Sequence, residues 1–261
     1  PGKSNVILPE PTYGMYEVAA NVQNCLVKKV LLNNDFSLNA EEVLSATNAD
    51  TRIIFICSPN NPTGNEFEPE EIEKVLKSFK GIVVLDQAYA DFSEKTKWRN
   101  RIGEFPNLAV LQTFSKAWGM AALRVGILFT NPEIINILMR IKLPYNMNEL
   151  TQQAVLDALK DQNRVQNWIQ FIKTERAELI EVLKDLYMVK EVFPTDANYV
   201  LARFNNAELV YNTLKEKGII VRNRSQQPLC ENTLRISIGT PVENNTLFEE
   251  LKEIDNNLKT K

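Results

Sequence analysis

Short runs of consecutive apolar residues, separated by helical segments, recur through the first half of the chain. The segment Arg52–Cys57 is apolar at almost every position, and Gly81–Asp86 repeats this pattern and ends in an acid. Continuous apolar runs of this length are typical of strands in a parallel sheet that is covered on both faces. Because an amphipathic segment, Pro69–Lys77, lies between them, the alternation predicts an α/β fold with a mostly parallel sheet.

The remaining elements follow the same logic. Further strands of the first set are predicted at Val6–Leu8, Cys25–Leu32, Leu108–Leu111 and Val125–Phe129. Helices are predicted at Met15–Val22, from an N-cap at Asn39 through Leu44, and from Pro69, which suits a first helical position. The pattern is almost wholly helical from Pro132 to about Leu186, with a break at Leu143–Tyr145.

The last part of the chain returns to mixed structure. Strands are predicted at Asn198–Phe204, Gly218–Arg222 and Leu234–Ile238, and helices at Glu208–Lys217 and Glu243–Leu258. We therefore expect a large domain over residues 1–150, followed over residues 151–261 by connecting helices and a smaller C-terminal α/β domain.

Composition narrows the possible functions. The 261 residues are 44% hydrophobic and 24% charged, which is typical of a globular protein, and a net charge of −3 gives no indication of a nucleic-acid or membrane partner. No apolar run approaches about 18 residues, and the three cysteines match no metal or redox spacing, so we expect a cytoplasmic protein with reduced thiols. The chain contains no histidine, which excludes serine–histidine and cysteine–histidine catalysis and removes the commonest metal ligand. No metal site is predicted.

Five chemically distinctive residues come just after apolar runs or a few positions beyond them. They are Asn61, Asp86, Tyr89, Lys116 and Arg124. In open α/β sheets, ligands bind beyond the carboxyl ends of the strands. Each residue alone has an ordinary structural explanation, such as a helix cap, a turn or a core aromatic. Together they predict a binding site at one edge of the sheet.

Lys116 is the most unusual of these residues, because it lies in a small-residue loop between two predicted buried strands. Burial of an ammonium group is costly, so a lysine in such a place is often neutral or used chemically. The chemical use is formation of a Schiff base with a carbonyl or an aldehyde cofactor. The alternative is a loop lysine whose amine reaches the solvent.

Several motifs occur in one order along the chain: Ser58–Gly64, Asp86–Tyr89, Ser115–Lys116 and the following Arg124. In this order and spacing the chain resembles the fold-type-I, pyridoxal-phosphate (PLP) dependent aminotransferases of classes I and II. The resemblance runs from Pro9 to about Thr240. It implies a PLP-dependent transferase fold, with a large cofactor-binding domain and a smaller C-terminal domain.

The resemblance also implies a role for each site residue. Lys116 binds PLP covalently, and its freed amine then moves a proton on the substrate as general base and acid. Asp86 faces the pyridine nitrogen and keeps it protonated. The other implied contacts are Asn61 and Tyr89 to the phenolic oxygen, Tyr13 to the ring face, and Ser115 and Arg124 to the phosphate.

Within the family, the chain is most similar to the histidine-biosynthesis branch, which converts histidinol phosphate and 2-oxoglutarate to imidazole-acetol phosphate and glutamate. The segments that carry this likeness are Pro11–Tyr16, Asp196–Tyr199, Ile220–Arg222 and Leu234–Thr240. The likeness implies that Arg235 binds a substrate carboxylate and Arg222 the phosphate, with Asn61 also near the substrate. Arg224 lies on the same face as Arg222 if the strand alternates, and is a possible helper.

Other members of the superfamily stay open as alternatives. They are an aromatic aminotransferase, a phosphothreonine decarboxylase, and a non-catalytic domain of the kind found in transcription regulators. Gln87 stands where many relatives carry an acid. The family's N-terminal arm, a tyrosine donated across the homodimer, and a phosphate-binding helix would all precede Pro1, so we expect the chain to lack its N-terminal portion.

Overall fold

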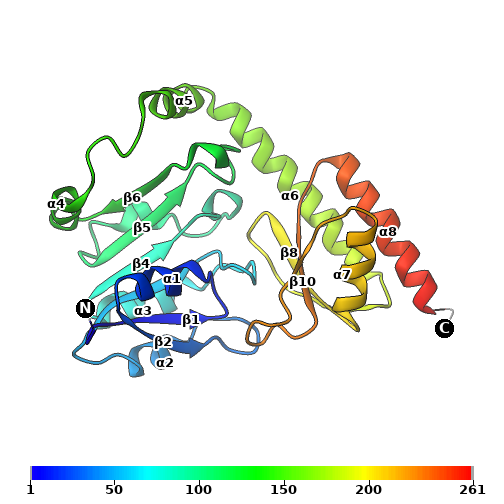
Figure 1. The fold of residues 1–261 in the computed structure, drawn as a ribbon, viewed down its shortest axis with the longest axis horizontal. Coiled ribbons are helices and arrows are strands. Elements are labelled where there is room, and N and C mark those ends of the chain that lie inside the picture. Colours follow the sequence, from blue (N-terminus) through cyan, green and yellow to red (C-terminus); the bar gives the residue numbers. More distant parts are fainter. Residues whose placement is uncertain (1, 260–261) are drawn as a thin grey trace.

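Six strands form one sheet in the first half of the chain, in the order β2-β1-β3-β4-β5-β6 (Figure 1). The computed structural model describes residues 2–259. The strands are β1 (Asn5–Glu10), β2 (Leu26–Leu31), β3 (Thr51–Cys57), β4 (Ile82–Asp86), β5 (Leu108–Thr113) and β6 (Gly126–Thr130). All neighbouring pairs are parallel except β5 and β6, which are antiparallel. The predicted α/β class with a mostly parallel sheet is therefore confirmed.

Three helices connect the parallel strands: α1 (Met15–Val22), α2 (Ala40–Ser45) and α3 (Pro69–Ser78). Helix α2 begins after Asn39, whose side-chain oxygen accepts hydrogen bonds from the backbone N–H groups of Glu41 and Glu42 at 3.1 and 3.2 Å, so the predicted cap is confirmed. Helix α3 packs Ile72 and Val75 into the largest apolar core of the chain, against the strands of the sheet. The site residues predicted from the sequence lie at or just after the ends of these strands: Asn61 follows β3, Asp86 ends β4 and Lys116 follows β5.

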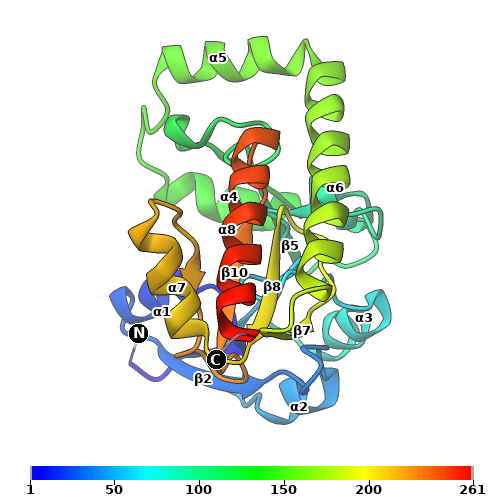
Figure 2. The same ribbon diagram turned by 90° about the vertical axis from the view of Figure 1, so that its right-hand side faces the viewer.

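A second sheet of four strands has the order β7-β8-β10-β9. Its strands are β7 (Val189–Val192), β8 (Tyr199–Phe204), β9 (Arg222–Asn223) and β10 (Thr233–Ser237), with helices α7 (Ala207–Glu216) and α8 (Pro241–Lys259) beside them. Helices α4 (Pro132–Ile141) and α5 (Glu149–Leu159) lead to α6 (Gln162–Lys184), which runs along the molecule to the second sheet (Figures 1 and 2). The apolar core there joins α6, α7 and α8 to β8 and β10. The division near residue 150 remains our proposal.

One prediction about this second sheet is wrong in detail, and one of its strands is missing from the predictions. The apolar segment 218–222 was predicted as a strand, but only Arg222 and Asn223 pair with β10. The preceding residues follow Gly218, whose φ of 80° ends α7, and Val221 is held by burial rather than by strand pairing. Strand β7 was not predicted, because its four residues alternate too briefly to give a signal.

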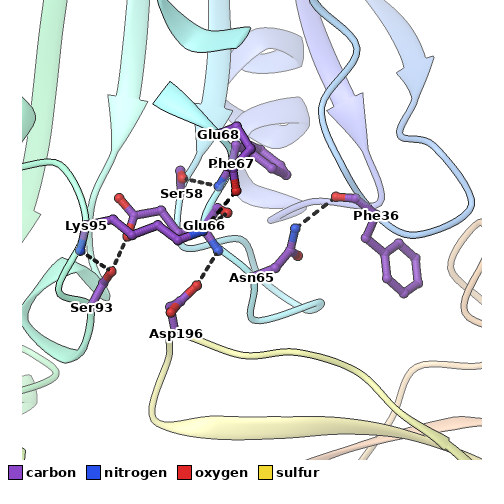
Figure 3. A network of polar contacts seen from close by, with 9 residues as sticks. All are labelled: Phe36, Ser58, Asn65, Glu66, Phe67, Glu68, Ser93, Lys95 and Asp196. Carbon is purple, nitrogen blue, oxygen red and sulfur yellow. Dashed lines mark hydrogen bonds and ion pairs between the residues drawn. The ribbon is translucent and has the colours of Figure 1, made fainter. Parts of the chain in front are cut away.

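A polar network around Glu66 links the two halves of the chain (Figure 3). The backbone N–H of Glu66 donates to Oδ2 of Asp196 at 2.9 Å, and the N–H of Asp196 donates to the carbonyl oxygen of Gly64 at 2.7 Å. The Glu66 carboxyl group also contacts the Ser93 hydroxyl. Because Glu66 is only 4% exposed, burial raises the pKa of its carboxyl group to about 7.

We expect the Glu66→Gln variant to lose the pH dependence that this carboxyl group causes. A raised pKa in the folded state means that the neutral form is favoured there, so stability is full below the ordinary pKa of 4.5 and falls as the pH rises through about 7. Between about pH 6 and pH 8.5, the native chain should lose about 1 to 2 kcal/mol of unfolding free energy more than the variant. Urea unfolding at several pH values measures this, with Glu178→Gln, an exposed acid on α6, as control. Parallel curves for native and Glu66→Gln proteins would contradict it.

Candidate active site

Lys116 lies in the loop between β5 and β6, where the chain turns through a short 3-10 helix (Ala121–Leu123) before re-entering the sheet. Its Nζ is 5.2 Å from the centre of the Tyr89 ring, in a cation–π contact. The residue as a whole is exposed. The antiparallel β6 turns the chain back at this point, and leaves the loop at the rim of the sheet instead of inside it.

The pKa of the Lys116 amine is nevertheless lowered. The main cause is partial loss of water around the amine, and the cations Arg235 and Arg124 act in the same direction, while Asp86 opposes them. These electrostatic interactions place Lys116 among three residues that lie far apart in the sequence. A lysine with a lowered pKa is a larger fraction neutral near physiological pH, and only the neutral amine is a nucleophile or base.

Asp86 is the last residue of β4, and its carboxyl group is held from two sides. Oδ2 accepts a hydrogen bond of 2.6 Å from the Tyr16 hydroxyl, and Oδ1 accepts one of 2.9 Å from the backbone N–H of Ala88. Desolvation raises the pKa of the carboxyl group, while these hydrogen bonds and Lys116 lower it. Among the ion pairs of residues 2–259, none involves Asp86.

Tyr16 is a site residue that the sequence reasoning missed. It is 6% exposed, stacks on Phe55 of β3 at a ring-centre distance of 5.1 Å, and contacts the ring of Tyr13 edge-on at 5.5 Å. The available signal was the spacing of three positions between Tyr13, just before α1, and Tyr16 in its first turn, since residues at this spacing can contact each other at a helix start. Tyr13 itself is 43% exposed and presents its ring to the solvent at this end of the sheet.

Asn61 and Arg235 come together across the two halves of the chain. Nη1 of Arg235 donates to Oδ1 of Asn61 at 2.6 Å, and the Arg235 guanidinium lies 4.9 Å from the ring centre of Tyr199. Tyr199 packs edge-on against Tyr89 at 5.2 Å and donates from its hydroxyl to the Asn60 carbonyl oxygen at 2.6 Å. The sequence predicted no role for Tyr199, yet its ring makes the cation–π contact with Arg235.

Burial raises the pKa of the Tyr89 hydroxyl to about 12, with Arg235 acting in the opposite direction. The hydroxyl is therefore a hydrogen-bond donor at physiological pH. The same Arg235 lowers the pKa of Lys116, so Tyr89, Lys116 and Arg235 share one electrostatic neighbourhood. This neighbourhood lies at the carboxyl ends of β3, β4 and β5, where the sequence predicted the site.

Ser115 and Arg124 are less tightly placed. Arg124 is exposed, has a left-handed backbone with φ of 56°, and donates from Nη1 to the Ala121 carbonyl oxygen at 3.1 Å. The Ser115 N–H donates to Oγ1 of Thr113 at 3.0 Å. Within the described part of the chain, no hydrogen bond joins either residue to the other predicted site residues. Arg124 is connected to the site through its charge, which lowers the pKa of Lys116.

Three arginines of the second sheet lie close to this neighbourhood. Arg222 on β9 is directly opposite Arg235 on β10, and Arg224 follows β9. Arg222 is exposed, whereas Arg224 and Arg235 are partly buried. The ion pairs formed within residues 2–259 include none of these three guanidinium groups. The arrangement therefore provides a concentrated positive charge that the described protein does not neutralise.

Residues 2–259 contain no group of acids and cysteines arranged to hold a metal ion and no helix long and apolar enough to cross a membrane. The described cysteines are free thiols, and burial raises the pKa of Cys57 to about 12 and that of Cys230 to about 11. The site thus offers a lysine, a carboxyl group, tyrosines and arginines as its chemical groups.

This combination of fold and site matches one family. The sequence profile of the class I and II aminotransferases matches residues 1–251, and the chain belongs to this family. With the relatives described next, this family membership makes the chain a PLP-dependent transaminase.

Individual relatives agree with this assignment. The histidinol-phosphate aminotransferase of Flavobacterium johnsoniae is 49% identical over 97% of this chain and 72% of the relative's length. The histidinol-phosphate aminotransferase of Bacteroides thetaiotaomicron is also 49% identical, over 97% of this chain and 73% of that protein. The crystal structure of the corresponding enzyme from Clostridium acetobutylicum superimposes with a TM-score of 0.92 at 27% identity, over 97% of this chain and 78% of that one.

The side chains at this site fit PLP. Asp86 is a largely desolvated carboxyl group, and desolvation raises its pKa. A protonated ring nitrogen beside it would supply the opposite charge. Lys116 is an accessible amine with a lowered pKa, as attachment to an aldehyde requires. The exposed ring of Tyr13 offers a flat apolar surface beside Asp86 through its contact with Tyr16.

Proposed function

We propose that this chain transfers the amino group of histidinol phosphate to 2-oxoglutarate, giving imidazole-acetol phosphate and glutamate. The observation that carries the proposal is the cluster of Arg222, Arg224 and Arg235 without carboxylate partners, of which Arg235 acts electrostatically on Lys116. Both substrates are anions, one a phosphate ester and the other a dicarboxylate. The identity of 49% to two histidinol-phosphate aminotransferases supports the same substrate.

We further propose how the site residues divide the work on the cofactor. Lys116 would hold PLP covalently, Asp86 would bind its ring nitrogen, and Tyr13 would cover its ring face. Asn61 and Tyr89 would donate hydrogen bonds to the phenolic oxygen, and Ser115 and Arg124 would bind the phosphate. When bound, PLP supplies an electron-withdrawing ring next to the substrate's reacting carbon.

The proton transfer would be carried out by the chain's own groups. The Lys116 amine, with its lowered pKa, would accept the proton from the substrate carbon and return it at the next position as general acid. Asp86, fixed by the hydrogen bonds from Tyr16 and Ala88, would keep a negative charge in one position throughout. Arg235 would orient the carboxylate of glutamate or 2-oxoglutarate, and Arg222 the phosphate of histidinol phosphate.

Asn61 would take part in substrate binding through Arg235, because its side-chain oxygen already fixes one nitrogen of the guanidinium group. We also propose that the chain acts in the cytoplasm as a homodimer. The alternatives within the same family are an aromatic aminotransferase and a phosphothreonine decarboxylase. The first needs no phosphate site, and the second needs one but releases carbon dioxide instead of an oxo acid.

Turnover on three amines separates these functions. We expect the chain to act on histidinol phosphate at least about tenfold more efficiently than on phenylalanine or phosphothreonine. The Arg222→Leu variant should raise the KM for histidinol phosphate about tenfold or more, since a charged hydrogen bond to phosphate is lost, and should change the phenylalanine reaction less than about threefold. Steady-state kinetics measures both. Equal loss on all three amines, or preference for phenylalanine, would contradict the proposal.

A further inference from the structure

We propose that Arg224 is a third anion-binding residue, which joins Arg222 in binding the phosphate group of the substrate. The inference rests on the proposed function for the identity of the substrate, and on the geometry of the second sheet for the residue. Arg224 directly follows β9, and its backbone N–H donates to the Thr233 carbonyl oxygen at 2.9 Å, which continues the pairing with β10 by one residue. Because strand side chains alternate, Arg222 and Arg224 lie on one face of the sheet, the face of Arg235.

Two other guanidinium groups, those of Arg222 and Arg235, act on Arg224, and no ion pair among residues 2–259 neutralises them. The pKa of Arg224 is lowered first by burial and then by Arg235 and Arg222, so all three guanidinium groups repel one another. Arg222 and Arg235 are directly opposite each other on paired strands, and like charges in such positions are generally destabilising. An arginine with a purely structural role would carry a carboxylate or a carbonyl partner. No side-chain hydrogen bond or ion pair of Arg224 is present among residues 2–259, and its Nε is buried without a partner.

The neighbouring Arg235 differs in one respect that separates the two anion sites. One nitrogen of its guanidinium group is already bound by Asn61, and the group lies 4.9 Å from the centre of the Tyr199 ring, so Arg235 is restrained by two contacts. Its charge therefore suits a carboxylate held at one defined place. Arg222 and Arg224 lack such side-chain restraints within the described chain. Two unrestrained guanidinium groups on one face suit a phosphate dianion, which has more acceptor oxygens and more charge than a carboxylate.

The test uses inorganic phosphate as the probe and thermal unfolding as the readout, so that it does not depend on turnover. Phosphate should raise the unfolding temperature of the native chain, and the Arg224→Gln variant should need at least about tenfold more phosphate for half of that effect. Without phosphate, the variant should unfold at the same or a higher temperature, because one of three repelling charges is gone. Arg164→Gln, on α6 with Asp161 as its partner, serves as the matched control and should behave like the native chain.

Kinetics gives the second readout. Arg224→Gln should raise the KM for histidinol phosphate at least about tenfold, while the KM for 2-oxoglutarate and kcat change less than about threefold. Arg224→Lys keeps the charge but loses the planar, forked guanidinium group. Its phosphate midpoint and its KM for histidinol phosphate should lie between those of the native chain and those of Arg224→Gln. A chain that does not turn over histidinol phosphate would refute the proposed function, whatever Arg224 does. An unchanged phosphate midpoint and unchanged KM in Arg224→Gln, or in Arg224→Lys should the first variant fail to fold, would refute the role of Arg224.

Discussion

Replacing Lys116 by alanine is expected to lower transamination by about 10³-fold or more, because the variant loses both the covalent attachment point and the general base. Among residues 2–259, the other cations that act on Lys116 are the arginines Arg235 and Arg124, and a guanidinium group does not replace the amine that forms a Schiff base. Steady-state rates with saturating PLP measure the loss.

A second measurement locates the attachment without relying on activity. Borohydride reduction of the native chain with PLP should add the mass of the reduced cofactor at Lys116, and the Lys116→Ala variant should gain none. Lys160→Ala, an exposed lysine paired with Asp157, is the control and should remain both active and labelled. A Lys116→Ala protein that transaminates at the native rate would refute the assignment of this lysine.

Replacing Asp86 by asparagine is expected to lower kcat by about 10²- to 10³-fold, with a smaller change in KM. Asparagine matches the carboxyl group in size, but it cannot carry the negative charge that would keep a ring nitrogen protonated. The free chain should not lose stability, because the pKa of Asp86 is raised by desolvation and a neutral group is cheaper to bury there. Kinetics and thermal unfolding of the same samples separate the two effects.

Tyr16→Phe tests the same carboxyl group with a smaller change than Asp86→Asn. It keeps the carboxyl group and removes only the hydrogen bond of 2.6 Å at Oδ2, so we expect a loss of about tenfold in kcat. That hydrogen bond lowers the pKa of Asp86, so its removal should shift the acid limb of the pH–rate profile to higher pH. Tyr187→Phe, an exposed tyrosine, should leave the profile unchanged. A Tyr16→Phe protein that lost as much activity as Asp86→Asn would show that the hydroxyl acts on more than the carboxyl group.

The sequence by itself determined the frame of this protein. Apolar runs such as Arg52–Cys57 are typical of strands in a covered parallel sheet, and the Asn39 cap and Pro69 mark where helices begin, because these are local properties of the chain. The ordered motifs from Ser58 to Arg124 also predicted the family and its lysine. What the sequence could not determine was the exposure of Lys116, because exposure depends on how β6 turns back along β5.

Only the tertiary structure decided which residues meet. Tyr16 reaches Asp86 because α1 packs over the strands next to β4. Asn61 binds Arg235, which lies 174 positions later in the chain, because the second sheet lies against the first. Contacts of this kind arise from the packing of whole elements, and no local pattern of residues encodes them. The opposition of Arg222 and Arg235 likewise required the register of β9 on β10, a strand of two residues that sequence reasoning placed too early. The anion site therefore follows from strand register, while the identity of its arginines was visible in the sequence.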